Sequence, residues 1–257
     1  MLASRLKEKL KTPQPTIGPM MTFDFWAGYL EIYKKAGMDF VLVDLEHGSA
    51  GLGKLEELCR TARLLDLPLI VRPEATIHHL LRKYLDMGPS GFMVPWTESD
   101  EQVETLRGAM FTPPRGRRGP GGPSIYGAPT LDRAGWDEVE KNLFAMVQIE
   151  SPRGIEQMGT FAAHDFIDAV MLGPYDLSLH LDHCWDWDHP ELVSAITGVI
   201  QQASTMGKPC GMPVGNLEQA RFWQQRGCHF FLYSEATQMA RVAAESFVKE
   251  MRDSESH

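Results

Sequence analysis

The sequence contains few cysteines and no apolar segment long enough to span a membrane. Its four cysteines, Cys59, Cys184, Cys210 and Cys228, are widely spaced and form no C-x-x-C pair. This pattern indicates neither a disulfide framework nor a structural zinc site, and it is typical of proteins in a reducing compartment. No run approaches the roughly 18 apolar residues of a membrane-spanning helix, and the charged amino-terminal segment lacks the apolar stretch of a secretion signal. We therefore expect a cytoplasmic protein.

Basic residues are also in deficit. The chain has 25 Lys and Arg against 34 Asp and Glu, which gives a formal net charge of −9. A nucleic-acid or membrane-surface partner would favour a basic patch, so this balance argues against both and leaves small molecules as the expected ligands. With 257 residues, of which 43% are hydrophobic, the chain has the size of one large α/β domain with a sizeable core.

Short apolar runs alternate with amphipathic segments along the whole chain. The alternation predicts eight strands, each followed by a helix, which is the count of a (β/α)8 TIM barrel made of one domain over residues 1–257, with an additional charged helix at the amino terminus. A doubly wound open sheet is the alternative, because alternation alone does not show closure. The predicted strands cover residues 16–20, 40–45, 68–72, 91–95, 143–149, 169–172, 209–213 and 229–233. The predicted helices cover residues 23–36, 52–65, 77–87, 98–110, 154–161, 191–206, 217–225 and 237–252.

Two stretches interrupt this rhythm. Residues 112–127 are rich in Pro and Gly, follow the fourth strand–helix unit, and are long enough for a functional loop or lid. Residues 180–189 contain three histidines, three aspartates and two tryptophans. Their irregular spacing matches known metal-ligand patterns poorly, so we expect a surface or interface loop there in preference to a metal site.

Charged residues follow several of the predicted strands, namely His47, Arg72, Glu150 and Asp176. Burying such a group costs several kcal/mol unless it is paired or coordinated, and the carboxyl ends of barrel strands converge on one face. Each residue alone has an ordinary structural explanation, such as a helix cap, an ion pair or a satisfied buried histidine. Taken together they predict one shared site, in which two carboxylates bind a divalent cation such as Mg²⁺ or Mn²⁺.

Several motifs carry a family resemblance. In chain order they are Asp44-Leu45-Glu46-His47-Gly48, Val71-Arg72-Pro73, Leu85-Asp86-Met87-Gly88, Val94-Pro95, the Pro/Gly/Arg run 113–119, Val147-Gln148-Ile149-Glu150-Ser151 and the Gly-Pro-Tyr-Asp-Leu-Ser run 173–178. From about Ile17 to the last helix, the chain resembles the HpcH/HpaI family of metal-dependent class II aldolases. The resemblance implies a (β/α)8 barrel that reversibly joins pyruvate, or a similar 2-oxo acid, to an aldehyde. It also implies a divalent cation (Mg²⁺, Mn²⁺ or Co²⁺) and dimer-based homo-oligomers such as hexamers.

The resemblance further implies the role of each site residue. Glu150 and Asp176 are expected to hold the cation, which the 2-oxo acid chelates, and Arg72 to contact the carbonyl oxygen. His47 is expected to act as the acid/base, with Asp86 as its orienting partner. The residues expected to line the substrate site are Arg72, Gln148, Gly173, Pro174, Tyr175, Asp176 and Pro213.

The sequence departs from the family pattern around the second substrate. Tyr233-Ser234-Glu235 replaces a smaller turn, Pro213 stands where an aliphatic residue is common, and Arg117 adds a cation beside Arg118. The main hypothesis is cleavage of a 4-hydroxy-2-oxo acid. The alternatives are a citrate synthase-like Claisen condensation of oxaloacetate with acetyl-CoA, in which Arg117 would bind a second carboxylate or a CoA phosphate, and a catalytically inactive barrel. No lysine ends a predicted strand, which disfavours a Schiff-base mechanism.

Overall fold

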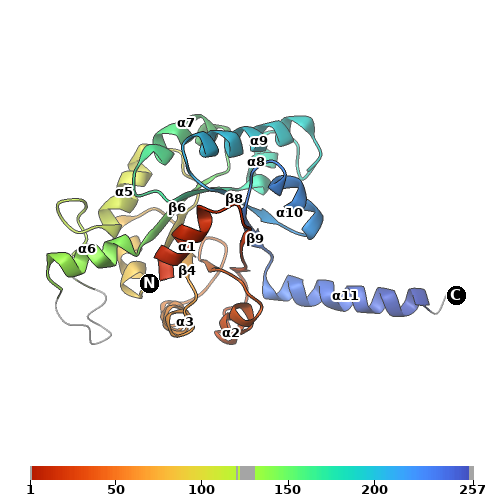
Figure 1. The fold of residues 1–257 in the computed structure, drawn as a ribbon, viewed down its shortest axis with the longest axis horizontal. Helices are drawn as coiled ribbons and strands as arrows, with labels where there is room; N and C mark the ends of the chain where they lie inside the picture. Colours follow the sequence, from red (N-terminus) through yellow and green to blue (C-terminus); the bar gives the residue numbers. More distant parts are fainter. Residues whose placement is uncertain (1, 120, 122–130, 255–257) are drawn as a thin grey trace.

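A ring of parallel strands forms the centre of the molecule (Figure 1). The computed structural model describes residues 2–119, 121 and 131–254. The predicted first strand is interrupted at Pro19: β1 (Thr16–Gly18) pairs with β9 (Phe230–Tyr233), and β2 (Met20–Met21) pairs with β3 (Val41–Asp44). Because β1 and β2 lie at the two ends of the strand order, this one segment closes the ring. The predicted TIM barrel is confirmed over the open sheet.

The other elements follow the predicted alternation closely. The remaining strands are β4 (Leu69–Arg72), β5 (Gly91–Val94), β6 (Phe144–Ile149), β7 (Ala169–Leu172) and β8 (Cys210–Val214). The helices are α1 (Leu2–Leu10), α2 (Gly28–Lys35), α3 (Leu52–Leu64), α4 (His78–Asp86), α5 (Asp100–Met110), α6 (Arg133–Lys141), α7 (Pro152–Ala163), α8 (Pro174–His180), α9 (Pro190–Thr205), α10 (Leu217–Gln224) and α11 (Ala236–Ser254). Helices α6 and α8 were not predicted. None of the described helices is both long and apolar enough to cross a membrane.

One end of the barrel is sealed by the amino-terminal helix. Apolar side chains fill the interior of the ring, with Phe40, Phe144 and Phe230 fully buried among them. Helix α1 places Ala3, Leu6 and Leu10 against this interior cluster. Since α1 precedes the first strand, it covers the amino-terminal ends of the strands. The carboxyl ends are therefore the open face on which a site can form.

The Pro/Gly-rich segment lies at the sealed end as far as it is described. Residues 112–119 follow α5, and helices of a βα barrel finish at the amino-terminal ends of the strands. Buried Glu140 anchors the segment, accepting hydrogen bonds from the Thr112 backbone N–H at 2.8 Å and from the Thr112 hydroxyl at 2.5 Å. The described part therefore lies away from the carboxyl ends of its own strands. Residues 120 and 122–127 of the predicted loop fall outside the described residues, and the functional loop or lid stays a prediction.

The last helix does not cover its own barrel. Figure 1 shows α11 extending away from the strands towards the carboxyl terminus. Residues 240–253 are all exposed, and among them Phe247 and Met251 are 67% and 51% exposed. Helix α11 therefore presents apolar side chains to solvent, which is unusual for the eighth helix of a barrel.

Candidate active site

Asp44, Arg72 and Gln148 lie together at the carboxyl ends of β3, β4 and β6. The strand register places Asp44 directly beside Arg72. The Arg72 guanidinium also reaches across β5, where Nη1 lies 3.4 Å from Gln148 Oε1 on β6. All three side chains are buried. The shared site predicted from the strand ends is thus built partly from these neighbours.

Arg72 is held by a two-point ion pair. Its Nε donates to Asp44 Oδ1 at 2.8 Å and its Nη2 to Asp44 Oδ2 at 2.7 Å. Burial alone would raise the pKa of Asp44, but the hydrogen bonds and charge of Arg72, with backbone N–H groups of Glu46 and His47, lower it. Thr22 donates a further hydrogen bond to Asp44 at 3.1 Å. The carboxylate therefore fixes both the charge and the orientation of the guanidinium.

Glu150 is a buried acid with a strongly shifted pKa. It is 2% exposed, accepts the Trp96 backbone N–H at 2.7 Å and accepts the Gln148 side-chain amide at 2.6 Å. Burial, and to a smaller extent the charges of Glu46 and Asp176, raise the pKa of Glu150 to about 8, against the lowering effects of the Trp96 N–H and of Arg72. Negative charge at this position is thus under-compensated by the surrounding protein.

Asp176 approaches Glu150 through a tight turn. Gly173 follows β7, and a Cβ atom there would lie 2.3 Å from Glu150 Oε2, so a larger residue would displace the carboxylate. Pro174 then begins α8, whose first turn carries half-buried Asp176. Among the described residues no cation forms an ion pair with Asp176, and its charge raises the pKa values of both Glu46 and Glu150.

The carboxylates of Glu46, Glu150 and Asp176 therefore lie close together. Within the described part of the site the only buried cation is Arg72, and Asp44 already neutralises it. Oxygen donors of this kind suit Mg²⁺ or Mn²⁺, which are usually bound by one or two protein carboxylates with water and substrate completing the shell. The donor set at Glu150 and Asp176 fits a divalent cation of this class.

Glu46 belongs to the site, although the sequence-based assignment left it out. Its Oε2 lies 3.1 Å from Arg72 Nη1 and 3.8 Å from His47 Nε2, and its side chain is 12% exposed. Burial raises the pKa of Glu46, while Arg72 and His47 lower it. The signal was present in the sequence, because Glu46 lies between Asp44 and His47 in the motif that carries the family resemblance.

His47 and Asp86 are not brought together within one chain. The His47 side chain is 61% exposed, and its ion-pair partner is Glu46. Asp86 ends α4, and it pairs with Arg118 at 3.2 Å. No hydrogen bond or ion pair joins Asp86 to His47 in the described residues. The orienting role of Asp86 stays a prediction, and Glu46 is the carboxylate beside His47 in this chain.

A cavity of about 270 Å³ adjoins Pro174 and Tyr175, the two residues that precede Asp176. Pro174, Tyr175 and Pro213, all predicted to line the substrate site, share its wall with aromatic residues of the following loop and of α10. The Tyr175 ring packs edge-on against Trp187 at a centroid distance of 4.8 Å. Arg117 is not part of this wall, since its backbone N–H donates to Gly108 near the end of α5, at the sealed end of the barrel.

Known proteins resemble this chain over nearly its whole length. The hydroxypyruvate/pyruvate aldolase of Delftia acidovorans is 33% identical over 255 residues, covering 94% of this chain and 90% of the relative. The crystal structure of an HpcH/HpaI aldolase from Desulfitobacterium hafniense superposes with a TM-score of 0.87 at 27% identity, covering 96% of each chain.

Two more distant structures share the fold. Citrate synthase SbnG has a TM-score of 0.84 at 22% identity, with 99% of this chain and 100% of that chain covered. The citrate lyase β subunit from M. tuberculosis, complexed with oxaloacetate and magnesium, has a TM-score of 0.52 at 20% identity, with coverages of 90% and 95%. The sequence pattern of HpcH/HpaI aldolase/citrate lyase matches residues 26–230. The chain therefore belongs to the HpcH/HpaI aldolase/citrate lyase family.

Proposed function

We propose that this chain is a class II aldolase that reversibly cleaves a 4-hydroxy-2-oxo acid into an aldehyde and pyruvate or a similar 2-oxo acid. The observation that carries this proposal is the buried, under-compensated carboxylate Glu150 beside Asp176 and the fixed guanidinium of Arg72. The name of the Delftia acidovorans relative supports the substrate class. The magnesium in the M. tuberculosis structure supports a divalent cation.

Glu150 and Asp176 would hold the cation, and Arg72 would bind the substrate beside it. A bound Mg²⁺ or Mn²⁺ polarises a carbonyl oxygen and stabilises negative charge that develops on it. Arg72 donates a hydrogen bond to the same oxygen, and because Asp44 already fixes the guanidinium, little reorganisation is required when the charge forms. The carboxylate of the 2-oxo acid would lie against the 173–176 turn.

His47 would move the proton. In the cleavage direction it accepts the proton of the 4-hydroxyl group as the C3–C4 bond breaks, so that the aldehyde leaves and the bonding electrons pass to the 2-oxo acid fragment as an enolate. Returning a proton to C3 then gives the 2-oxo acid. An imidazole has an unperturbed pKa near 6.5, which suits this exchange at neutral pH. Glu46, 3.8 Å away, would orient the ring in place of a more distant carboxylate.

Exchange of the methyl protons of pyruvate in D₂O, followed by NMR, tests the proposal. Exchange that is absent with EDTA and appears with Mg²⁺, Mn²⁺ or Co²⁺ is the expected result. Glu150→Gln and Asp176→Asn are the matched controls, since each keeps side-chain size and loses one charge. Absence of exchange with every metal would contradict the proposal and favour an inactive barrel.

The citrate synthase-like reaction is the second candidate, because citrate synthase SbnG shares the fold over the whole chain. Release of free thiol from acetyl-CoA in the presence of oxaloacetate would identify it. The position of Arg117 at the sealed end of its own barrel does not favour this reaction, since a CoA phosphate bound there would be remote from Glu150. The aldolase is therefore the better-supported function.

A further inference from the structure

The loop between α8 and α9 is folded tightly upon itself. The His183 backbone N–H donates to Ser178 at 2.8 Å, that of Asp186 to His183 at 3.0 Å, and that of His189 to Asp186 at 3.1 Å. The Trp185 backbone N–H donates to the Ser178 hydroxyl at 3.2 Å. These turns bring His183 and His189 together, a pairing that the irregular spacing of the histidines in the sequence did not reveal.

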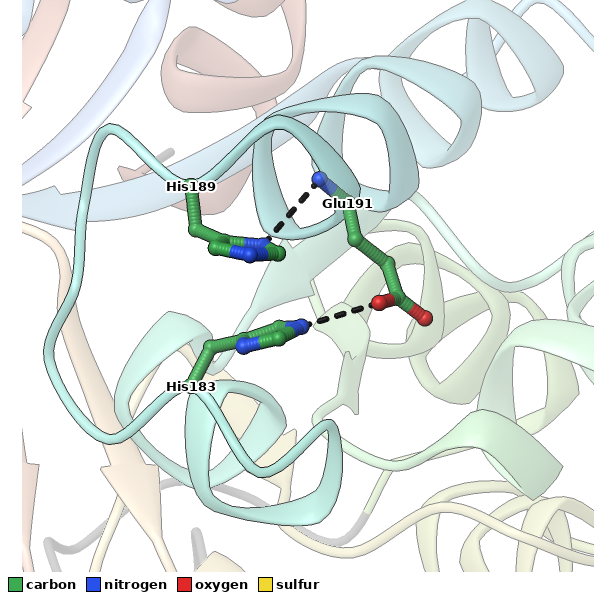
Figure 2. Close-up of side chains that lie close together, drawn as sticks. All are labelled: His183, His189 and Glu191. Atoms are coloured by element: carbon green, nitrogen blue, oxygen red, sulfur yellow. Dashed lines mark hydrogen bonds and ion pairs between the residues drawn. The ribbon is translucent and has the colours of Figure 1, made fainter.

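Two imidazoles and one carboxylate converge in this loop. Figure 2 shows the His183 and His189 rings stacked face to face, each with a nitrogen turned towards Glu191. The ring centroids are 3.3 Å apart, His183 Nε2 is 2.9 Å from Glu191 Oε2, and the Glu191 backbone N–H donates to His189 Nδ1 at 3.3 Å. One ligand atom from each side chain lies within 4.8 Å of the other two.

We propose that His183, His189 and Glu191 form a second cation site, selective for a first-row transition metal such as Zn²⁺ and distinct from the pair Glu150 and Asp176. Imidazole nitrogens suit Zn²⁺, Ni²⁺ and Cu²⁺, whereas Mg²⁺ requires oxygen ligands. Zinc takes nitrogen at about 2.0–2.1 Å, so two nitrogens on one tetrahedral ion lie roughly 3.3 Å apart. In the loop, one ligand atom from each of the three side chains lies within 4.8 Å of the other two, so side-chain rotations would bring them onto one ion, and water completes the shell.

The electrostatics of the loop favour a cation. Residues 181–191 include Asp182, Asp186, Asp188 and Glu191 and contain no Lys or Arg. His189 Nδ1 accepts the Glu191 backbone N–H, so this nitrogen carries a lone pair. A cation bound between the rings would also neutralise the negative charge of Glu191.

A second cluster of metal-ligating side chains is explained without a metal. His164 faces Asp100 and Glu104, with its two ring nitrogens 2.6 Å and 3.6 Å from these carboxylates. Both ring nitrogens of His164 already face carboxylates, and the cluster offers a metal only one imidazole. His183, His189 and Glu191 offer a metal two imidazoles and a carboxylate, which makes this cluster the stronger candidate.

Cation binding here would be sensed next to the candidate active site. Trp185 and Trp187 lie in the same loop and pack edge-on against Tyr175 at centroid distances of 6.4 Å and 4.8 Å. Tyr175, the residue before Asp176, lines the cavity of about 270 Å³. A cation that clamps His183 to His189 would therefore fix the aromatic wall of that cavity, and tryptophan fluorescence would report the binding.

Zinc titration of the metal-stripped, full-length protein tests the site. Isothermal titration calorimetry and metal analysis after dialysis would compare four proteins. They are the wild type, the histidine double variant (His183→Asn and His189→Asn), the carboxylate double variant (Glu150→Gln and Asp176→Asn), and the variant that combines all four changes. Asparagine at position 189 preserves the cap of α9, because it is a favoured N-cap residue. We expect the histidine double variant to lose one zinc ion per chain, and Mg²⁺ to show no binding event that depends on these histidines.

Full zinc stoichiometry in the histidine double variant would overturn the site, whatever the carboxylate variant shows. Unchanged zinc and Mg²⁺ binding in the carboxylate variant would instead contradict the proposed catalytic cation, so the two failures are distinguishable. Glu191→Gln alone should weaken zinc binding about tenfold, which keeps the test valid if the double variant folds poorly. In that case an anomalous zinc signal away from His183 and His189 in wild-type crystals would also overturn the proposal.

Discussion

Two pairs of charged residues at the strand ends are treated very differently by this fold. Asp44 and Arg72 are both buried and neutralise each other through two short hydrogen bonds. Glu150 and Asp176 are both acids, Glu150 is buried, and no protein cation in the described residues is paired with either. The first pair is complete in the protein alone and positions a guanidinium. The second is incomplete in the protein alone, and this is the property expected of a cation site.

Removing the charge of the incomplete pair should have the largest effect on activity. Glu150→Gln or Asp176→Asn is expected to reduce metal-dependent turnover below detection, because the variant lacks an oxygen ligand with full charge. Fold retention would be checked by circular dichroism. Wild-type kcat/KM in either variant at saturating Mg²⁺ would show that the residue is not a ligand.

Breaking the ion pair between Asp44 and Arg72 should have the largest effect on stability. Asp44→Asn leaves the Arg72 charge buried without its partner, and such changes typically cost about 3–5 kcal/mol of unfolding free energy. Urea denaturation measures this loss. The control is Asp137→Asn, which breaks the exposed Arg133–Asp137 pair and should leave the unfolding free energy nearly unchanged. Equal effects of the two changes would contradict the positional role of Asp44.

Substitution of the proposed proton-transfer residue, His47, should affect proton exchange without affecting cation binding. His47→Gln is expected to slow pyruvate proton exchange by about 10²-fold, the usual lower bound for general acid–base catalysis, without changing the affinity for Mg²⁺. Glu46→Gln should have a smaller effect of about tenfold and shift the pH profile of exchange, since it acts through the orientation of His47. Unchanged exchange in the His47 variant would remove the residue from the mechanism.

The raised pKa of Glu150 predicts how the metal-free protein responds to pH. Because the pKa is about 8 in the folded protein and 4.5 is the ordinary value, the folded state binds more protons than the unfolded state between these limits. Stability should therefore fall as pH rises through this window, by at most about 1.4 kcal/mol per pH unit. Thermal melts of the wild type and Glu150→Gln with EDTA measure this, and the variant should show a flatter profile.

Much of the fold was predictable because its signals are local. Runs such as 40–45 and 169–172 are apolar, end at polar residues, and are separated by amphipathic segments, so strand positions and the barrel count followed directly. Helix α8 was missed because Gly173-Pro174 is typical of a turn, although Pro at the first helical position also starts helices. Helix α6 was missed because it follows the Pro/Gly-rich segment and buries little of its surface.

The site was predictable in composition and less so in arrangement. The strand ends gave Arg72, Gln148 and Glu150 because parallel strands deliver their last residues to one face. The motifs carry the residue types of His47 and Asp86 and not the distance between them, so the pairing of the two stays a prediction. The pairing of His183 with His189 likewise depends on turns that form through backbone hydrogen bonds with little sequence signature.

Helix α11 would make the stability of the molecule depend on protein concentration in the homo-oligomer that the family resemblance predicts. Its 19 residues form an arm about 28 Å long, and exposed Phe247 and Met251 lie far along it. The homo-oligomer that the family resemblance predicts would bury this arm, and a contact between separate chains strengthens by mass action as the chains become more numerous. The thermal midpoint should therefore rise with protein concentration. At nanomolar concentration the chains would dissociate and be less stable than the assembled protein at higher concentration.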